Sequence, residues 1–532
     1  MNLAILHYHL NRGGVTRVIE NHLAALDTAL GAAHDAMHDT TLDADRPWRV
    51  ALLFGGRCEG FPEDLTRRLA SLRVSLYPIE ALDYDGMEAD GSRSQRDDVA
   101  SESLYRQLND TLGPLGFQPG NTVLHVHNHA LGKNRSLLPV LARLAEAGYA
   151  MVLQIHDFVE DFRPANYRHI GPAAAVGLYP QAPAIHYCVL NGRDHGILRE
   201  AGVSAERLHL LPNPVSDVPG TADVPSKADA RAKLCERFGV GRDDRLLLYP
   251  VRGIRRKNLG EALFYSALAP RGQLVGVTLP PLNPAELPVY EGWKRLAAEL
   301  HLPCRFELGA SGGLGLAENM AAADAILTTS LAEGFGMVFL ETWLAGLPLV
   351  GRDLPDITSD FLAAGVRLDG LQPQLRVPLD WIGAERFCRA LRTAYLATLA
   401  AYGCPTPPGL DSDLQAKIAA GWVDFGDLDE PMQAAVIRSV CRSESHRRRM
   451  WDENPWLADV FTVNAQSTED VIEQNKAAIR QHFSLAVSGR RLLDLYAQAA
   501  GAGGSRQLEP LPHGEKIMAR FLEFNRFRLI RT

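Results

Sequence analysis

The sequence lacks paired cysteines, a long apolar run and any excess of basic residues. Its seven cysteines are scattered and none forms a C-x-x-C pair, which is typical of reduced thiols rather than of a disulfide framework. The longest uncharged stretch, residues 171–192, contains three prolines and is a poor membrane span. The net charge of −8 argues against a broad surface for nucleic acid or anionic lipid.

Several well-known site motifs and targeting signals are also missing. There is no Walker loop, no G-x-S-x-G elbow and no G-x-G-x-x-G fingerprint. Residues 1–10 have no basic region before their apolar residues, so we expect no secretory signal peptide. Together these absences predict a cytoplasmic protein with no integral membrane segment and no nucleic-acid partner.

The first half of the chain alternates short apolar runs with amphipathic segments. Apolar runs separated by helices predict a parallel sheet with helices on both faces. Amphipathic stretches at 15–30, 104–112 and 136–147 predict helices between the strands. The runs that read as buried strands are 3–6, 50–54, 123–126, 151–155 and 185–190.

A second alternation of the same kind follows the proline-containing stretch 208–214. Its length supports a second domain, because 532 residues are too many for one core. The expected strands are 246–249, 274–278, 305–308, 325–329 and 348–351, and the expected helices are 259–268, 288–300, 314–322 and 337–345. We expect domains at 1–215 and 216–368, a mostly helical insertion at 369–470, and crossover helices at 471–532 that return to the first domain.

Unusual polar residues gather at the ends of the expected strands. HYHLNRGG follows the first strand, HVHNHALGKN the third, His156-Asp157 the fourth, VRGIRRKN the strand 246–249, and SLAEGFGMVFLE the strand 325–329. In open α/β sheets, ligands bind beyond the carboxyl ends of the strands. We therefore expect these groups to converge on one ligand site.

Residues 333–341 read EGFGMVFLE, two glutamates separated by seven residues. Gly334 and Gly336 let the backbone approach a ligand and turn into a helix, whose first N–H groups attract an anion. Glu341 lies one to two turns into that helix, where its carboxylate can accept a hydrogen bond from a ribose. A capped surface helix with solvated acids explains the pattern about equally well.

Arg252 and Lys257 follow the expected strand 246–249 closely. Two cations suit a diphosphate, because a departing nucleotide diphosphate gathers negative charge in the transition state. Arg255 and Arg256 are alternatives or neighbours in this role. For an isolated run of this kind, a solvated basic turn is the default interpretation.

These motifs together resemble the retaining GT-B glycosyltransferases, especially family 4. Glu333 and Glu341 fall on that family's Glu-x7-Glu element, and Arg252, Lys257 and Asn258 fall on its Arg-x4-Lys/Asn element. The resemblance spans most of residues 1–360 and also 470–497, which is similar to the family's closing helix. It implies two Rossmann-like, doubly wound parallel-sheet domains that face each other across a cleft.

The first half of the chain carries further elements of the resemblance. Gly13 and Gly14 match a glycine loop facing the donor phosphates, and His156 matches a histidine that contacts the donor sugar. The chain departs from the family at 351–355, where Gly-Arg-Asp-Leu-Pro replaces a glycine-rich segment, and in the insertion at 369–470. The identities of donor and acceptor therefore stay open.

The resemblance implies retaining, metal-independent transfer from a nucleotide-diphosphate sugar, with no cofactor beyond this co-substrate. The catalytic residues implied are Glu333, Arg252, Lys257 and His156. The donor-binding residues implied are Gly13, Gly14, Arg252, Lys257, Gly334, Phe335, Gly336, Met337 and Glu341. No second carboxylate is placed as a nucleophile, in contrast to retaining glycosidases, so stabilisation of charge by cations is the main catalytic effect expected.

Polar residues of the third and fourth strand ends are candidates for the acceptor, which we expect to be soluble. They are His127, Asn128, His129, Lys133, Asn134 and Asp157. Structural roles for the histidines, or a solvated helix turn at Lys133 and Asn134, are about equally consistent. His125, His127 and His129 alternate as metal ligands do, but no matching downstream set appears, so we expect no metal. Asp83-Tyr84-Asp85 is one of several Asp-x-Asp matches in the chain, which makes that motif unspecific.

Two further functions fit the same residues. A GT-B phosphorylase or sugar-nucleotide epimerase would use the same donor site, with phosphate-dependent product release or donor isomerisation as its signature. A non-catalytic sugar-nucleotide-binding protein would bind the donor without turnover.

Overall fold

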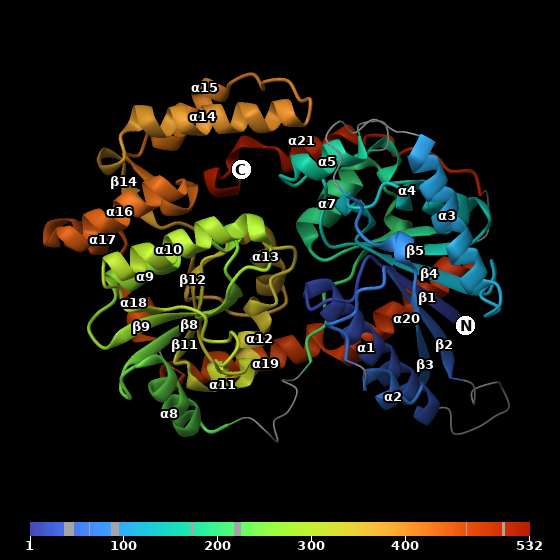
Figure 1. Cartoon of the computed structure of the whole chain (residues 1–532), viewed down its shortest axis with the longest axis horizontal. Helices are drawn as coiled ribbons and strands as arrows, with labels where there is room; N and C mark the ends of the chain where they lie inside the picture. The colour runs from blue at the N-terminus through green and yellow to red at the C-terminus, as the bar shows by residue number, and fades with distance from the viewer. Residues whose placement is uncertain are drawn as a thin grey trace. The chain divides into compact units, whose positions relative to one another are not determined.

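Two parallel β-sheets, one in each part of the chain, carry the fold (Figure 1). The computed structural model describes residues 1–36, 47–62, 64–86, 95–171, 175–216, 225–463, 465–502 and 506–531. Its contacts divide the chain into two units. Unit 1 comprises residues 1–216, 401–403 and 481–523, and unit 2 comprises residues 217–400, 404–480 and 524–532.

The sheet of unit 1 has seven strands in the order β3-β2-β1-β4-β5-β6-β7, and every neighbouring pair is parallel. The strand order reverses between β1 and β4. The strands are β1 (Asn2–His7), β2 (Trp48–Phe54), β3 (Leu72–Pro78), β4 (Thr122–His127), β5 (Ala150–Ile155), β6 (Ile185–Val189) and β7 (Leu208–Leu210).

The buried-run criterion missed β3 and β7. Both lie at an edge of the sheet, and most of their side chains are partly or fully exposed. The inner strands are buried on both faces, which is why they read as continuous apolar runs. In β1, Leu3 and Ile5 join one hydrophobic cluster and Ala4 and Leu6 join the other, as the alternation of side chains along a strand requires.

The sheet of unit 2 has six strands in the order β10-β9-β8-β11-β12-β13, again with parallel neighbours. The order reverses between β8 and β11. β8 runs past the expected end at 249 to Arg252, after a shift in register. The strands are β8 (Arg245–Arg252), β9 (Gln273–Leu279), β10 (Cys304–Arg305), β11 (Ala325–Thr328), β12 (Leu349–Arg352) and β13 (Leu371–Gln372).

Helices flank the sheets in both units. In unit 1 they are α1 (Gly14–Ala36), α2 (Leu65–Arg68), α3 (Gln95–Leu112), α4 (Leu137–Glu146), α5 (Pro164–Ile170), α7 (Gly192–Ala201), α20 (Leu485–Gly501) and α21 (Glu515–Phe521). Unit 2 contains α8 (Lys227–Phe238), α9 (Leu259–Leu268), α10 (Leu287–Glu299), α11 (Leu316–Ala322), α12 (Val338–Leu344), α13 (Pro355–Ala363) and α19 (Glu469–Phe483). The expectation of two doubly wound parallel sheets is confirmed.

The segment 470–497, which is similar to the family's closing helix, contains two helices rather than one. α19 ends at Phe483 and α20 begins at Leu485, with Ser484 in an extended conformation between them. The backbone N–H of Val215 bonds to the carbonyl of Phe483, so the interruption is held by a strand-like contact. Periodicity alone cannot show such a break, because the apolar spacing continues across it.

α20 packs against α1 within unit 1 (Figure 1). The two backbones approach so closely at Gly489 that an added Cβ would lie 2.1 Å from the carbonyl oxygen of Ala25. The absence of a side chain at Gly489 therefore sets the depth at which α20 docks.

The expected insertion at 369–470 is mostly helical. Its elements are α14 (Ala384–Ala401), α15 (Leu410–Ile418), α16 (Glu430–Arg442), α17 (Glu444–Glu453), α18 (Leu457–Thr462), and the antiparallel pair β14 (Arg376–Pro378) and β15 (Trp422–Asp424). α16 packs on α9, and Phe425 stacks on Phe264 with ring centroids 4.7 Å apart. These elements extend the core of unit 2.

A buried ion network ties this extension to the sheet. Arg352, at the end of β12, donates to Glu261 of α9 at 2.6 Å and to Asp424 of β15 at 2.8 Å, and all three residues are less than 5% exposed. The guanidinium also meets the carbonyl of Pro373. The departure at 351–355 thus supplies the arginine that fastens β15 to the core.

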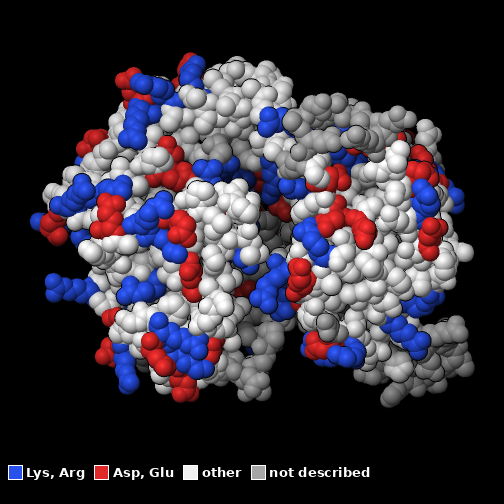
Figure 2. Space-filling model, viewed as in Figure 1, with Lys and Arg blue, Asp and Glu red and all other residues white. Residues whose placement is uncertain are grey.

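The surface carries charged side chains of both signs. On the face shown in Figure 2, basic and acidic side chains alternate across the surface rather than separating into large patches. Among the described residues, no helix combines the length and apolarity needed to cross a membrane.

Candidate active site

The candidate residues of unit 2 lie where its strand order reverses. β8 and β11 are neighbours in the sheet, with Leu248 paired to Ile326. The turn η5 (Arg255–Lys257) follows β8, and the segment leading to Glu333 follows β11. Ligands of doubly wound sheets bind beyond the carboxyl ends of strands at such a reversal.

Glu333 forms two ion pairs with η5. Its Oε2 accepts a hydrogen bond from Arg256 at 2.7 Å, and its Oε1 accepts one from the ammonium of Lys257. The side chains of Glu333 and Lys257 are 8% and 14% exposed, whereas that of Arg256 is 42% exposed. The strand ends thus hold one carboxylate and two cations together, and one of these cations reaches solvent.

The protonation of this cluster follows from burial and charge. Burial alone would raise the pKa of Glu333, but Lys257 and Arg256 together lower it to about 2. Burial lowers the pKa of Lys257, although the neighbouring Glu333 opposes that change. Glu333 is therefore a carboxylate at neutral pH and can accept hydrogen bonds from hydroxyl groups.

The other residues of the basic segment have separate contacts. Arg252 donates to the carbonyl of Pro280 at 3.2 Å, and Arg255 donates to Glu430 of α16 at 2.8 Å. Asn258 is fully buried and adopts a left-handed conformation, with its side chain bonded to Glu261 and Gln433. Asn258 therefore shapes the turn. Arg256, which the sequence offered only as an alternative or neighbour to Arg252, is the arginine that contacts Glu333.

The segment after Glu333 turns sharply into α12. Gly336 has a φ of +80°, and an added Cβ would lie 2.5 Å from the ring of Phe339, so glycine is required at this position. Phe335 is buried and packs against Phe361. Met337 precedes the first residue of α12, and Glu341 in its first turn is exposed. With Gly334, these residues form the expected glycine turn, while the helix begins one residue later than expected.

In unit 1, the glycine pair lies at the start of α1, after the end of β1. Gly13 and Gly14 are exposed, and a Cβ at Gly14 would meet nothing within 4 Å. The turn before them is braced by Gly60, whose N–H bonds to the carbonyl of Leu10 at 3.0 Å. A Cβ at Gly60 would lie 2.0 Å from the backbone nitrogen of Arg12. Sequence reasoning missed this support, because nothing in the sequence near residue 60 marks the contact.

His156 and His127 lie side by side at the ends of β5 and β4. His127 Nδ1 is 3.0 Å from His156 Nε2, and both residues are buried. Burial lowers the pKa of His156 to about 4, so its ring is neutral at physiological pH. Asn128, with a φ of +64°, accepts hydrogen bonds through its side-chain oxygen from the backbone N–H groups of His156 and Asp157.

The remaining acceptor candidates differ in their surroundings. His129 donates its Nε2–H to the carbonyl of Leu178 at 3.0 Å, and Asn134 donates to the carbonyl of Asp83 at 2.7 Å. Both side chains are 2% exposed and hold the polypeptide together locally. Lys133 lies over the ring of Tyr84 with its ammonium 5.7 Å from the centroid.

Lys133 has a second cation near it. Burial lowers the pKa of Lys133, and the positive charge of Arg163 lowers it further. Arg163 itself pairs with Asp157. Asp161 also pairs with Arg163, so two carboxylates already offset the charge of this arginine.

No protein-family model matches the chain. The chain has a GT-B fold, the fold of its structural neighbours. The Anabaena protein HepE, solved in complex with UDP-glucose, superposes with a TM-score of 0.51 at 14% identity, covering 93% of this chain and 99% of that one. The sucrose-phosphate synthase of Thermosynechococcus elongatus superposes with a TM-score of 0.54 at 14% identity, covering 94% and 100% of the two chains.

One curated relative has detectable sequence similarity. It is the mannosylglucosyl-3-phosphoglycerate synthase of Petrotoga mobilis, which is 26% identical over 364 residues. The match covers 68% of this chain and 66% of that protein. The chain therefore spans slightly less than two thirds of the length of this relative.

Proposed function

We propose that the chain is a glycosyltransferase that moves a sugar from a nucleotide-diphosphate sugar to an acceptor hydroxyl with retention and without a metal. The pairing of Glu333 with Lys257 and Arg256 at the strand reversal of unit 2 carries this proposal. The GT-B fold and the resemblance of the motifs support it, as does similarity to a mannosylglucosyl-3-phosphoglycerate synthase.

The leaving diphosphate is stabilised by three cations, Lys257, Arg256 and Arg252. As the bond between sugar and phosphate breaks, negative charge collects on the phosphate oxygens, and cations already in place lower the energy of that state. Arg256 is half exposed beside a buried carboxylate, so it can turn toward a phosphate while Lys257 keeps Glu333 ionised. Gly13 and Gly14 of unit 1 are exposed and stay candidates for backbone contacts to an anion, as the resemblance implies.

Glu333 and the turn Gly334–Met337 take the role of holding the transferred sugar, and Glu341 that of holding the ribose. A carboxylate with a pKa of about 2 stays an acceptor for sugar hydroxyls throughout the neutral range. His156 is neutral and takes the role of a hydrogen-bonding partner for the sugar. In this mechanism the departing phosphate accepts the proton of the acceptor hydroxyl, and cationic side chains replace the metal.

We further propose a soluble, anionic acceptor that carries a phosphate or carboxylate, bound near Lys133. The adjacent cations Lys133 and Arg163 support this choice, and so does the phosphoglycerate in the name of the Petrotoga relative. Asn128 and Asp157 take supporting roles, since they fix the strand ends next to these cations.

The deciding experiment has two stages. Thermal unfolding is first measured with a panel of nucleotide sugars that includes UDP-glucose and GDP-mannose, because a true donor stabilises the folded protein by mass action. The stabilising donor is then incubated with 3-phosphoglycerate and glucosyl-3-phosphoglycerate in EDTA, and the anomeric configuration of any product is determined by NMR.

A glycoside of retained configuration formed in EDTA is the expected result. Product formation that requires inorganic phosphate, or isomerisation of the donor alone, would show a phosphorylase or epimerase instead. Donor binding without turnover across the acceptor panel would show a binding protein. An inverted product would overturn the retaining mechanism while leaving the transfer itself intact.

A further inference from the structure

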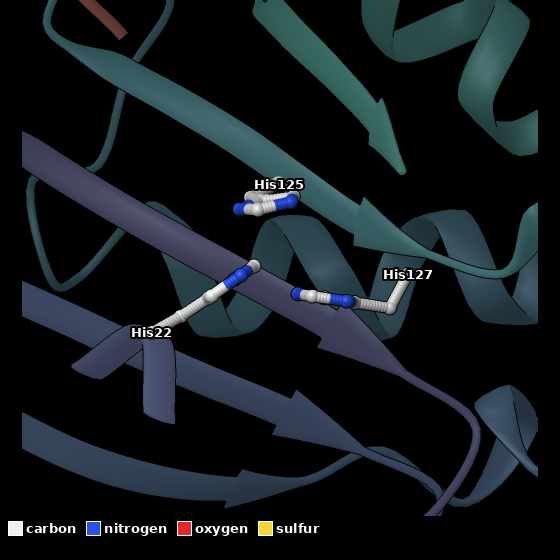
Figure 3. A group of neighbouring side chains, drawn as sticks. All are labelled: His22, His125 and His127. Atoms are coloured by element: carbon white, nitrogen blue, oxygen red, sulfur yellow. The ribbon is translucent and has the colours of Figure 1, made fainter. Parts of the chain in front are cut away.

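Three buried histidines form a cluster in unit 1, and one of them, His127, contacts His156. His22 comes from α1, and His125 and His127 come from one face of β4, two residues apart. In Figure 3 the rings of His22 and His127 point toward each other, and the ring of His125 lies beside them. The rings of His125 and His127 are stacked, with centroids 4.3 Å apart. One ring nitrogen of each lies within 4.8 Å of those of the other two, and all three residues are at most 1% exposed.

The polar atoms of this cluster are incompletely satisfied. Within the described part of the chain, neither ring nitrogen of His22 has a hydrogen-bond partner, and neither does Nε2 of His127. A buried polar atom without a partner costs about 1–3 kcal/mol, so each such atom in a folded protein requires a physical reason. A bound ion would satisfy one nitrogen of His22 together with Nε2 of His127.

The other contacts of the rings suit metal ligation. His127 can donate its Nδ1–H to His156 Nε2 at 3.0 Å, which leaves the Nε2 lone pair free. His125 is held by Gln154 at 2.9 Å and by the hydroxyl of Tyr496 at 2.7 Å. Metal-bound histidines commonly have the second nitrogen fixed by such a partner. To bind the metal, a nitrogen of His125 must give up its present hydrogen bond to Gln154 or Tyr496.

We propose that His22, His125 and His127 form a binding site for Zn²⁺ or a similar transition-metal ion. Three imidazoles are a known zinc ligand set that leaves a further position for water. Nitrogen atoms around zinc at 2.0–2.1 Å are about 3.4 Å apart, so small side-chain rotations close the observed spacing. Mg²⁺ and Ca²⁺ are excluded as occupants, because they prefer oxygen ligands.

The site would join α1 to β4, two elements of unit 1. It borders His156 through His127. The proposed transfer requires no metal, so the two proposals are tested independently.

The test uses the full-length, tag-free protein expressed in zinc-supplemented medium. We expect about one zinc per chain after extensive dialysis, since buried histidine ligands release the metal slowly. After chelation, titration with Co²⁺ is expected to produce the ligand-field absorption of a tetrahedral nitrogen-ligated ion, which Zn²⁺ then displaces. Mg²⁺ serves as the ion that should have no effect.

Variants separate this site from adventitious binding. His22→Leu and His127→Gln are expected to weaken Co²⁺ binding more than about 100-fold, since outer-shell changes alone cost 10- to 100-fold. His186→Leu is the matched control, because His186 is a buried histidine on β6 of the same sheet, and it should bind Co²⁺ as the wild type does. A wild type that takes up no stoichiometric metal overturns the proposal, as does a signal that survives both variants.

Thermal unfolding distinguishes the loss of metal binding from a loss of folding in a variant. His22→Leu replaces unsatisfied polar atoms with apolar ones, so the chelated variant should unfold at or above the temperature of the chelated wild type. Zn²⁺ should then raise the unfolding temperature of the wild type and of His186→Leu but leave His22→Leu unchanged. Equal Zn²⁺-induced shifts in all three proteins would contradict the assignment.

Discussion

The ammonium of Lys257 is hydrogen-bonded to the carboxylate of Glu333, although the two residues are separated by 76 positions in the chain. Both side chains are largely buried, and each charge is tolerated because the other is present. In the proposed reaction these residues serve the two halves of the donor, the diphosphate and the sugar.

Replacing Lys257 with alanine should abolish most of the transfer activity. We expect kcat to fall by about 100-fold or more, the effect of removing one group that stabilises transition-state charge. Lys227→Ala is the matched control, because Lys227 forms an exposed ion pair with Asp324 in the same unit. Initial rates at saturating donor and acceptor check the result, with circular dichroism to confirm folding. Similar rates for both variants would remove Lys257 from the mechanism.

Glu333 should make the stability of the protein depend on pH in the acid range. The folded state lowers its pKa from 4.5 to about 2, so its contribution is complete above about pH 4.5 and is lost as the pH falls toward 2. The difference in unfolding free energy between wild type and Glu333→Gln should therefore shrink across this window. Denaturant titrations at several pH values check this, and a constant difference would contradict the ion pairing.

Glu160 should give the opposite dependence at higher pH. It is 5% exposed and accepts a hydrogen bond from Tyr179 at 3.0 Å, and burial raises its pKa to about 7. Its stabilising contribution is complete below pH 4.5 and is lost as the pH rises through 7. Glu160→Gln should gain stability relative to the wild type between these values and show no further gain above them. Parallel pH-dependent unfolding curves of the two proteins would refute this.

Lys133→Gln should weaken acceptor binding selectively. We expect the KM for an anionic acceptor to rise about 10-fold, which corresponds to the loss of one charge-assisted hydrogen bond of about 1.5 kcal/mol, while the KM for the donor stays unchanged. Lys516→Gln, on an exposed position of the same unit, should leave both constants unaltered. An equal effect of Lys133→Gln on a neutral acceptor would show that the lysine does not recognise an anion.

Gly489 should be irreplaceable in the packing of α20 on α1. Alanine there would place its Cβ 2.1 Å from the Ala25 carbonyl oxygen, and the resulting displacement should cost about 1–3 kcal/mol or more. Gly196 in α7 is the control, because a Cβ there meets nothing within 4 Å. Gly196→Ala should stabilise the protein by about 0.5–1 kcal/mol. Chemical denaturation of both variants checks the contrast.

The inner strands and the two-sheet organisation were predictable because burial on both faces leaves a direct trace, a short continuous apolar run. β1 and β8 were found in this way, whereas the edge strand β3 was missed because its outer face is solvated. The break at Ser484 was missed for a related reason, since the apolar period continues across it. Local sequence patterns therefore predict buried strands well, but they predict exposed edge strands and breaks between helices poorly.

The chain itself determined which chemical groups follow the strands: the glycine pair at 13–14, the cations of 252–257, and the two glutamates of 333–341. Tertiary structure alone decided the partners. The packed structure places Arg256 beside Glu333 and pairs Arg255 with a glutamate of α16. It also places Asn258 and Arg352 in buried hydrogen-bond networks. It also brought His22 to His125 and His127 across about a hundred residues. Local sequence carries propensity and periodicity, but contacts between distant segments depend on helix rotation and strand register, which only the packed molecule sets.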